Sequence, residues 1–150
     1  RLAEDFKLTT GTWVQVGNLR LQAIAASEPV IQDCVVTGHD RDFIGLLAFP
    51  NLEACRGLCP GLAADAPAEL VLADPGVRRA LISGLARHNA EYPASSTRIR
   101  RVMLMETPAR IDAGEITDKG YINQRAVLTE RASAVERLYA GGDPEIVDID

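Results

Sequence analysis

The sequence predicts an α+β fold: a small mixed β-sheet with helices packed on it, plus an N-terminal β-hairpin. Short apolar segments rich in strand-favouring residues alternate irregularly with segments of helical periodicity, and turn residues separate them. The chain has 150 residues, 47% of them hydrophobic, so it can bury one core and is expected to form one domain. No apolar run approaches the length that spans a bilayer, and no membrane partner is expected.

The first 28 residues predict a hairpin followed by a helix. In residues 5–16, Thr, Trp and Val favour strands, and Gly11 supplies a permissive turn residue. Residues 17–28 then read as a helix that ends before a proline, with one apolar face formed by Leu21, Ile24 and Ala25.

Two mostly buried strands are expected next, at residues 30–36 and 43–49, because apolar residues dominate both segments. A polar turn at residues 38–42 joins them, and its Asp40, Arg41 and Asp42 are interpreted as turn residues. Residues 51–73 are expected to form a loosely ordered excursion with little function, because four residues there break helices: Gly57, Pro60, Gly61 and Pro67.

A helix is expected from Asp74-Pro75, a typical start with Asp at the cap and Pro in the first turn. Apolar residues at helical spacing continue to residue 92. A strand follows at residues 99–105. The arginines around its start are expected on a solvated strand edge: Arg98, Arg100 and Arg101.

The last part of the chain predicts a loop at residues 107–121 and a final helix at residues 122–140. The acidic residues 143–150 are expected to fray. The final helix carries one apolar stripe: Leu128, Ala132, Val135 and Tyr139.

Charge and cysteine content limit the class of protein. The net charge of −5 argues against a general nucleic-acid binder. An odd number of cysteines does not suit a secreted disulfide scaffold, so free thiols in a reducing, cytoplasmic compartment are expected. His39 and His88 do not complete a zinc site with them, and no metal site is expected in the chain. The cysteines are Cys34, Cys55 and Cys59.

Motifs of catalysis are scarce. The chain has no glycine-rich phosphate loop of standard spacing, no paired carboxylates in an apolar setting and no nucleophile–histidine arrangement. Residue patterns alone therefore describe an α+β domain without an assigned function, and a non-catalytic interaction or dimerisation module is one hypothesis.

Two segments nevertheless resemble a known family. Residues 1–14, RLAEDFKLTTGTWV, are similar to the segment that opens the C-terminal domain of adenylate-forming acyl-CoA synthetases. Residues 114–127, GEITDKGYINQRAV, resemble the last motif of that family, in which a lysine precedes the terminal helix. The resemblance covers nearly the whole chain. Within the family, the residues of these segments are most similar to those of feruloyl-CoA synthetases. Residues 1–150 would then be the mobile C-terminal domain, without the N-terminal domain.

The resemblance implies roles for particular residues. Lys119 would be catalytic in the first half-reaction, in which a carboxylate attacks the α-phosphorus of ATP. The domain would then rotate about a hinge at Ala3, Glu4 or Asp5. The rotation would bring the hairpin to the site of thioester formation, where the residues near coenzyme A (CoA) would be Lys7, Gly11, Thr12 and Trp13. From the residues alone, packing of Trp13 on the core is the favoured interpretation.

The same resemblance implies partners. ATP and CoA would be substrates, Mg²⁺ would be bound mainly by the N-terminal adenylation domain, and the acid would be an aromatic carboxylic acid such as ferulate. A carrier-protein thiol could replace CoA as the acceptor. The chain alone would be inactive, because the nucleotide and acid pockets would belong to the N-terminal domain.

Overall fold

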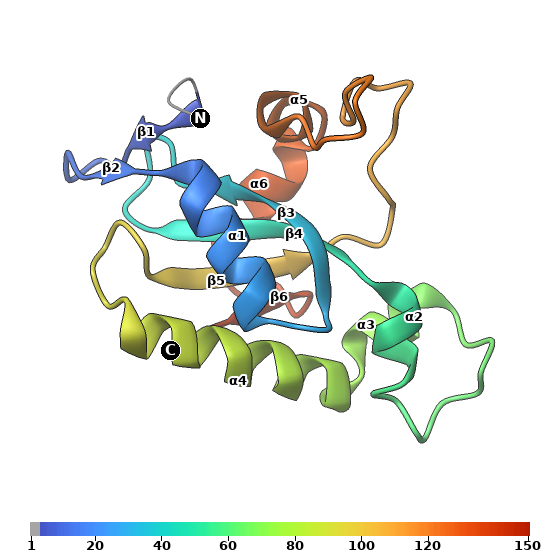
Figure 1. Cartoon of the computed structure of the whole chain (residues 1–150). Coiled ribbons are helices and arrows are strands. Elements are labelled where there is room, and N and C mark those ends of the chain that lie inside the picture. The colour runs from blue at the N-terminus through green and yellow to red at the C-terminus, as the bar shows by residue number, and fades with distance from the viewer. Residues whose placement is uncertain (1–3) are drawn as a thin grey trace.

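The computed structural model describes residues 4–150, so the hinge candidate Ala3 lies outside the described residues. It confirms the α+β prediction: a four-stranded mixed sheet with helices, preceded by a two-stranded antiparallel hairpin (Figure 1). The elements, in chain order, are β1 (Phe6–Lys7), β2 (Trp13–Val14), α1 (Val16–Ala26), β3 (Ile31–Thr37), β4 (Ile44–Pro50), α2 (Leu52–Arg56), α3 (Ala68–Ala73), α4 (Pro75–Glu91), β5 (Ile99–Leu104), α5 (Gln124–Glu130), α6 (Ala132–Ala140) and β6 (Ile146–Asp148).

The main sheet has the strand order β3-β4-β5-β6. β3 pairs with β4 antiparallel, β4 with β5 parallel, and β5 with β6 antiparallel. Parallel pairing requires a crossover connection, and α2, α3 and α4 supply it between β4 and β5. None of the helices in residues 4–150 combines the length and apolarity needed to cross a membrane.

β4 lies at the centre of the core and is buried along six of its seven residues. Alternate side chains of a strand point to opposite faces, so β4 contributes to two hydrophobic clusters. Ile44, Leu46 and Ala48 join the cluster that includes α1 and α4, whereas Leu47 and Phe49 join the one that includes α5 and α6. In Figure 1, α1 crosses in front of the sheet and α6 lies behind it.

The helix α4 forms as expected. Asp74 accepts a hydrogen bond from the backbone N–H of Gly76, at 2.8 Å, and Pro75 occupies the first turn. The apolar face of α4 is buried as predicted: Val77, Leu81 and Leu85 are fully buried and His88 nearly so.

The expectation of a loosely ordered segment at residues 51–73 was wrong, because two short helices, α2 and α3, form there. The segment turns between them because Arg56 Nη1 donates to the carbonyls of Ala64 (3.2 Å) and Ala66 (2.7 Å). Gly57 ends α2 and Pro67 precedes α3. These breakers do not prevent apolar side chains of the segment from joining the core: Cys55, Cys59, Ala66, Val71 and Leu72.

The three cysteines are buried and unpaired in the described structure, as expected. Burial disfavours the thiolate, because a buried charge loses its hydration. It raises the pKa of Cys34 to about 12 and that of Cys55 to about 11. These thiols therefore serve as small apolar core residues.

Two expectations for the C-terminus were also wrong. Residues 143–150 do not fray: β6 covers the second edge of β5, and Val147 and Ile149 enter the core. The final helix is two helices, because Arg131 takes non-helical angles (φ −113°, ψ 35°) between α5 and α6. In the predicted apolar stripe, Ala132 is exposed and the fully buried position is Leu138.

Three smaller expectations were wrong as well. Leu21 is 62% exposed, and α1 instead buries Val16, Leu19 and Ala23. Trp13 is 59% exposed and does not pack on the core. The arginines of β5 are not on a sheet edge, because β5 lies between β4 and β6. Arg101 instead donates to the Leu138 carbonyl, at 2.9 Å.

The contact between α4 and α1 depends on Gly84. A Cβ added at this position would collide with the backbone carbonyl of Ala26 at the end of α1. We expect Gly84→Ala to lower the free energy of unfolding by about 1–3 kcal/mol, because the clash outweighs the gain in helix propensity. Urea unfolding followed by circular dichroism measures this. Gly61→Ala is the matched control, since no heavy atom of the described chain lies within 4 Å of its added Cβ.

Candidate functional site

Lys119 lies at the tip of a small exposed hairpin loop. The backbone N–H of Thr117 donates to the Tyr121 carbonyl (2.8 Å), and that of Gly120 donates to the Thr117 carbonyl (2.9 Å). An isolated antiparallel β-bridge joins Ile116 to Ile122, the residues that flank this turn on either side. Gly120 has a φ of +85°, which explains why glycine follows the lysine. The loop therefore presents the Lys119 ammonium to solvent from a short, hydrogen-bonded turn.

The base of this loop is held by a buried ion pair. Glu115 is 1% exposed, and both of its carboxylate oxygens accept from Arg131: Oε2 from Nε at 2.7 Å and Oε1 from Nη2 at 2.9 Å. The backbone N–H of Arg110 donates to the same Oε1 at 3.0 Å. The Arg131 hydrogen bonds hold the pKa of Glu115 below its ordinary value. We call the Glu115–Arg131 pair the clamp.

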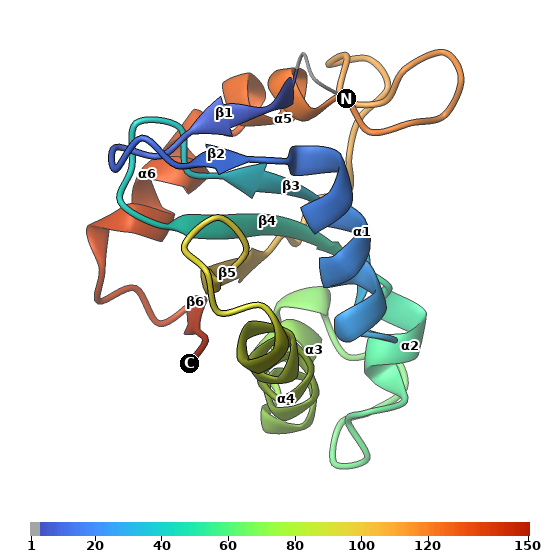
Figure 2. The same cartoon turned by 60° about the vertical axis from the view of Figure 1, so that its left-hand side comes forward.

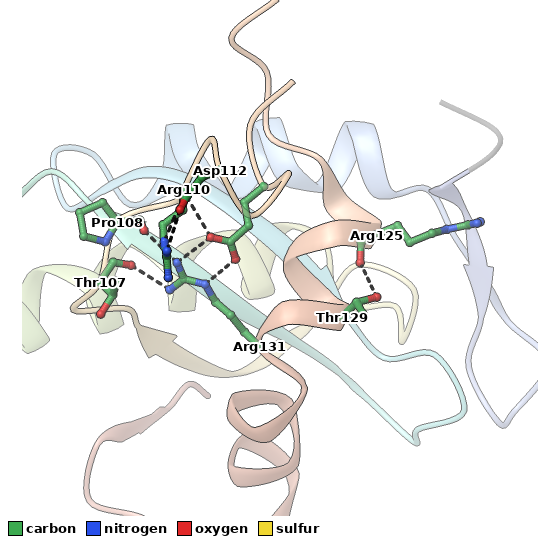
Figure 3. Close-up of polar contacts among 8 residues, drawn as sticks. Thr107, Pro108, Arg110, Asp112, Arg125, Thr129 and Arg131 are labelled. Atoms are coloured by element: carbon green, nitrogen blue, oxygen red, sulfur yellow. Dashed lines mark hydrogen bonds and ion pairs between the residues drawn. The ribbon is translucent and has the colours of Figure 1, made fainter. Parts of the chain in front are cut away.

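Arg131 also binds the beginning of the longer loop, residues 105–123, that carries the small hairpin with Lys119. Its Nη1 donates to the Thr107 carbonyl (2.8 Å) and its Nη2 to the Pro108 carbonyl (2.9 Å). The guanidinium lies over the ring of Phe49, 4.9 Å from its centroid, and so rests on β4. Figure 3 shows the guanidinium between these carbonyls and the carboxylate, with the exposed Arg110–Asp112 ion pair beside it.

The end of the loop is tied to the sheet by the two residues that follow Ile122. Asn123 caps α5 by accepting from the backbone N–H of Ala126 at 3.2 Å. The Gln124 side chain pairs with the backbone of Val36 on the edge strand β3, accepting from its N–H at 3.1 Å and donating to its carbonyl at 2.6 Å. The loop is therefore fixed at both ends, and its tip is left exposed.

The hairpin of β1 and β2 carries the residues predicted to lie near CoA. Lys7 and Trp13 are cross-strand partners, and the Lys7 ammonium lies 5.1 Å from the Trp13 ring centroid. Thr12 shares a 3.1 Å hydrogen bond with Thr10. Gly11 has a φ of +88°, and no heavy atom of the described structure lies within 4 Å of the position of a Cβ. The tip of the hairpin is thus exposed and open at Gly11.

Hydrogen bonds, together with burial of Phe6, Leu8 and Val14 in the core, fix this hairpin to the rest of the domain. Thr9 Oγ1 donates to Asp42 at 2.8 Å, and the Thr9 N–H donates to the Arg41 carbonyl at 3.0 Å, so the hairpin rests on the β3–β4 turn. The predicted hinge residue Asp5 accepts from the backbone N–H of Val16, at 3.0 Å. Its carboxylate thereby satisfies one of the backbone N–H groups that have no partner within the first turn of α1, and its negative charge lies at the positive end of the helix dipole. Glu4, the other described hinge candidate, is half-buried.

The hairpin and the Lys119 loop do not form one site. The blue hairpin and the orange loop stand apart in both Figure 1 and Figure 2. The sequence has two lysines: Lys7 lies in the hairpin and Lys119 in the loop, and we call these the two groups. Within residues 4–150, no three His, Cys, Asp or Glu side chains come together to hold a metal ion.

The family described as AMP-binding enzyme C-terminal domain matches residues 8–143, which include Lys119 and the hairpin residues Gly11, Thr12 and Trp13 but not Lys7. The chain belongs to this family. Such domains are part of adenylate-forming enzymes, and the match establishes the family without indicating a feruloyl-CoA synthetase.

Individual relatives agree with the family assignment. The chain is 25% identical over 140 residues to the probable acyl-activating enzyme 16, chloroplastic, of Arabidopsis thaliana, covering 93% of this chain and 19% of that protein. Its fold is similar to the A domain of a carboxylic acid reductase from Segniliparus rugosus, solved with AMP and a carboxylic acid (TM-score 0.69, 22% identity, 93% and 20% of the two chains). The A-PCP didomain of that reductase, solved with AMP, is similar as well (TM-score 0.66, 22%, 91% and 17%). The chain spans about a fifth of the length of these relatives.

Sequence patterns did not predict the residues that hold the loop: Glu115, Arg131 and Gln124. Glu115 and Gln124 lie inside the motif around Lys119, so the motif was a signal for them. Arg131 lies in a polar stretch and had no signal in sequence, because its partners are 16 to 24 residues away.

The clamp should make folding stability depend on acid pH. Because the pKa of Glu115 is lower in the native state, the unfolded chain takes up the proton first as the pH falls. The stabilising contribution is therefore complete above the ordinary glutamate value, about 4.3, and is lost as the pH falls through the lowered native pKa. Urea unfolding at a series of pH values should show a shallower acid dependence for Glu115→Gln. An unaltered dependence would contradict this account.

Proposed function

We propose that this chain is the mobile C-terminal domain of an ATP-dependent carboxylic acid–CoA ligase, and that it is inactive alone. The observation that carries the proposal is the position of Lys119. This lysine is exposed to solvent at the tip of a loop, and both ends of that loop are fixed to the sheet. Family membership supports it, as does the separation of the loop from the hairpin, because two separated groups suit two successive half-reactions.

In the first half-reaction, a carboxylate oxygen of the acid attacks the α-phosphorus of ATP. The new bond joins this oxygen to the α-phosphorus. The bond between the α-phosphorus and the oxygen that bridges it to the β-phosphorus breaks, and pyrophosphate leaves. Negative charge accumulates because an anion approaches a polyphosphate. The Lys119 ammonium would lower the barrier by offsetting this charge at a site built largely by the N-terminal adenylation domain.

In the second half-reaction, the thiol of CoA loses its proton and attacks the acyl carbon, and AMP leaves with the electrons of the broken bond. The domain would first rotate about a hinge near Glu4 and Asp5, withdrawing Lys119 and presenting the hairpin. Gly11 would let the pantetheine arm pass close to the backbone, beside Lys7, Thr12 and Trp13. The open space around Gly11 supports this role.

Mg²⁺, when bound with ATP, would offset phosphate charge and would be held mainly by the N-terminal domain. We propose a cytoplasmic location, and the unpaired cysteines support it.

We propose an aromatic acid of the hydroxycinnamate class, such as ferulate, as the substrate. The support is three sequence segments, residues 3–14, 38–42 and 115–127, which together resemble feruloyl-CoA synthetases. A carrier-protein thiol is the alternative acceptor, favoured by the likeness of the fold to an A-PCP didomain.

Lys119→Ala tests the first step. In the complete enzyme with ATP, Mg²⁺ and an acid from a panel of ferulate, benzoate and decanoate, we expect pyrophosphate release to fall by about 10²–10³-fold. Thioester formation from a supplied acyl-adenylate should persist. Lys7→Ala is the charge-matched control and should retain pyrophosphate release, because Lys7 would act only in the second step.

Retained pyrophosphate release by Lys119→Ala would contradict the proposal and favour a non-catalytic interaction or dimerisation module. Supplying CoA or a carrier protein to the second step distinguishes the two thiol acceptors.

Gly11→Ala tests the second step. The substitution forces a Cβ into a left-handed backbone conformation, at a cost of about 1–2 kcal/mol, but meets no neighbouring atom in the described domain. We expect thioester formation to fall and pyrophosphate release to persist. Loss of both in equal measure would mean that Gly11 serves the fold alone. Gly142→Ala is the matched control, because it shares a positive φ (+76°) and an open surrounding and lies outside the hairpin and the Lys119 loop.

A further inference from the structure

The clamp holds a loop that packs on the core through a few apolar side chains: Met105, Ala109 and Ile122. Two grooves flank the loop of residues 105–123. One, of about 370 Å³, lies between the loop and the end of β4, lined by Phe49, Pro108, Ile116 and Ile122 among others. The other, of about 460 Å³, opens on the side of α6 and includes Arg110, Glu115 and Arg131 in its lining. Polar contacts therefore contribute much of what fixes the loop.

The Arg131 guanidinium supplies most of these contacts. It makes four hydrogen bonds, two to Glu115 and one each to the carbonyls of Thr107 and Pro108. A planar fork with five donors can serve three separate points at once, which a lysine ammonium on a flexible stem cannot do in the same geometry. One side chain thus joins the start of the loop, its base and the sheet.

Stability alone is a weak reason for such a pair. Removing two charges from water costs several kcal/mol per ion, and replacing a buried ion pair by apolar residues is often neutral or stabilising. The side chains are 11% exposed in Arg131 and 2% in Glu115, so this cost applies here. What the pair adds over an apolar contact is direction, because each of its hydrogen bonds fixes an angle as well as a distance.

From this geometry we infer that Glu115 and Arg131 are positioning residues for Lys119: the clamp fixes the base of the loop so that the ammonium at its tip reaches the reacting phosphate. The inference rests on the proposed function. Lys119 is four residues from Glu115 along the chain, and the hydrogen bond from the Asn123 N–H to the Glu115 carbonyl (2.9 Å) closes the small hairpin directly at the clamp. A shift of the base is therefore transmitted to the tip.

The experiment uses the complete enzyme and the acid of the panel with which it releases pyrophosphate fastest. Arg131→Lys keeps the charge and removes the fork. We expect it to lower kcat for pyrophosphate release by about 10–100-fold, the scale of a displacement near 1 Å. KM for ATP and for the acid should stay unchanged, as should thioester formation from supplied acyl-adenylate.

A double-substitution cycle shows whether the clamp acts through Lys119. In the Lys119→Ala background, Arg131→Lys should cause no further loss of pyrophosphate release, because the group that it positions is absent. An additive loss would overturn the inference.

A second variant separates positioning from folding. Glu115→Leu combined with Arg131→Met removes both charges together and leaves no uncompensated ion, so stability should be retained. Pyrophosphate release should nevertheless remain low. Recovery of release together with stability would overturn the inference, since the clamp would then serve the fold alone.

Arg137→Lys is the matched control. Arg137 also binds two carboxylates, Asp143 and Glu145, each at 2.7 Å, but both follow α6 in the chain and neither belongs to the loop. The Arg137→Lys enzyme should release pyrophosphate at the rate of the unaltered enzyme. An equal loss in this variant would overturn the inference. If Lys119→Ala itself left pyrophosphate release intact, the proposed function would fail, whereas failure of the inference alone would leave the Lys119 effect in place.

Discussion

Burial of β4 on both faces is the constraint on which the arrangement of this domain depends. A strand in this position must be apolar at nearly every residue, and each face needs its own covering layer. Ile44, Leu46 and Ala48 require α1 and α4 on one side, and Leu47 and Phe49 require the C-terminal helices on the other. Gly45 adds to this fit, because a Cβ there would collide with Leu138 of α6 and Thr37 of β3.

The same strand reaches the candidate site through Phe49. Arg131 rests on this ring, binds Glu115 and so connects the sheet to the loop that carries Lys119. A second connection, from Gln124 to Val36, reaches the edge strand β3. Rigid supports therefore end in an exposed tip, an arrangement that suits a domain whose chemistry occurs on another domain's surface. The hairpin of β1 and β2 repeats this plan on the β3–β4 turn.

Sequence patterns were sufficient for elements whose causes are local. The Asp74 cap and the spacing of Val77, Leu81 and Leu85 predicted α4, and apolar runs predicted β3, β4 and β5. They were insufficient where distant partners decide. β6 forms because β5 offers it an edge, and the break at Arg131 accompanies contacts with residues on the preceding loop. Trp13 is exposed although tryptophan usually seeks burial, since its cross-strand partner Lys7 covers one face. The position of Lys119 followed from its motif, but the buried acid and base that support it did not.

The buried cysteines have a practical consequence. Thiols react with maleimides as thiolates, and Cys34 and Cys55 are shielded from solvent and protonated at neutral pH. A single cysteine introduced at an exposed position, such as Asp118 beside the tip of the loop, would therefore carry a fluorescent dye almost alone. The core chemistry of this domain thus makes it well suited to distance measurements by energy transfer, in which a dye on the loop or the hairpin would show whether the domain moves as we propose.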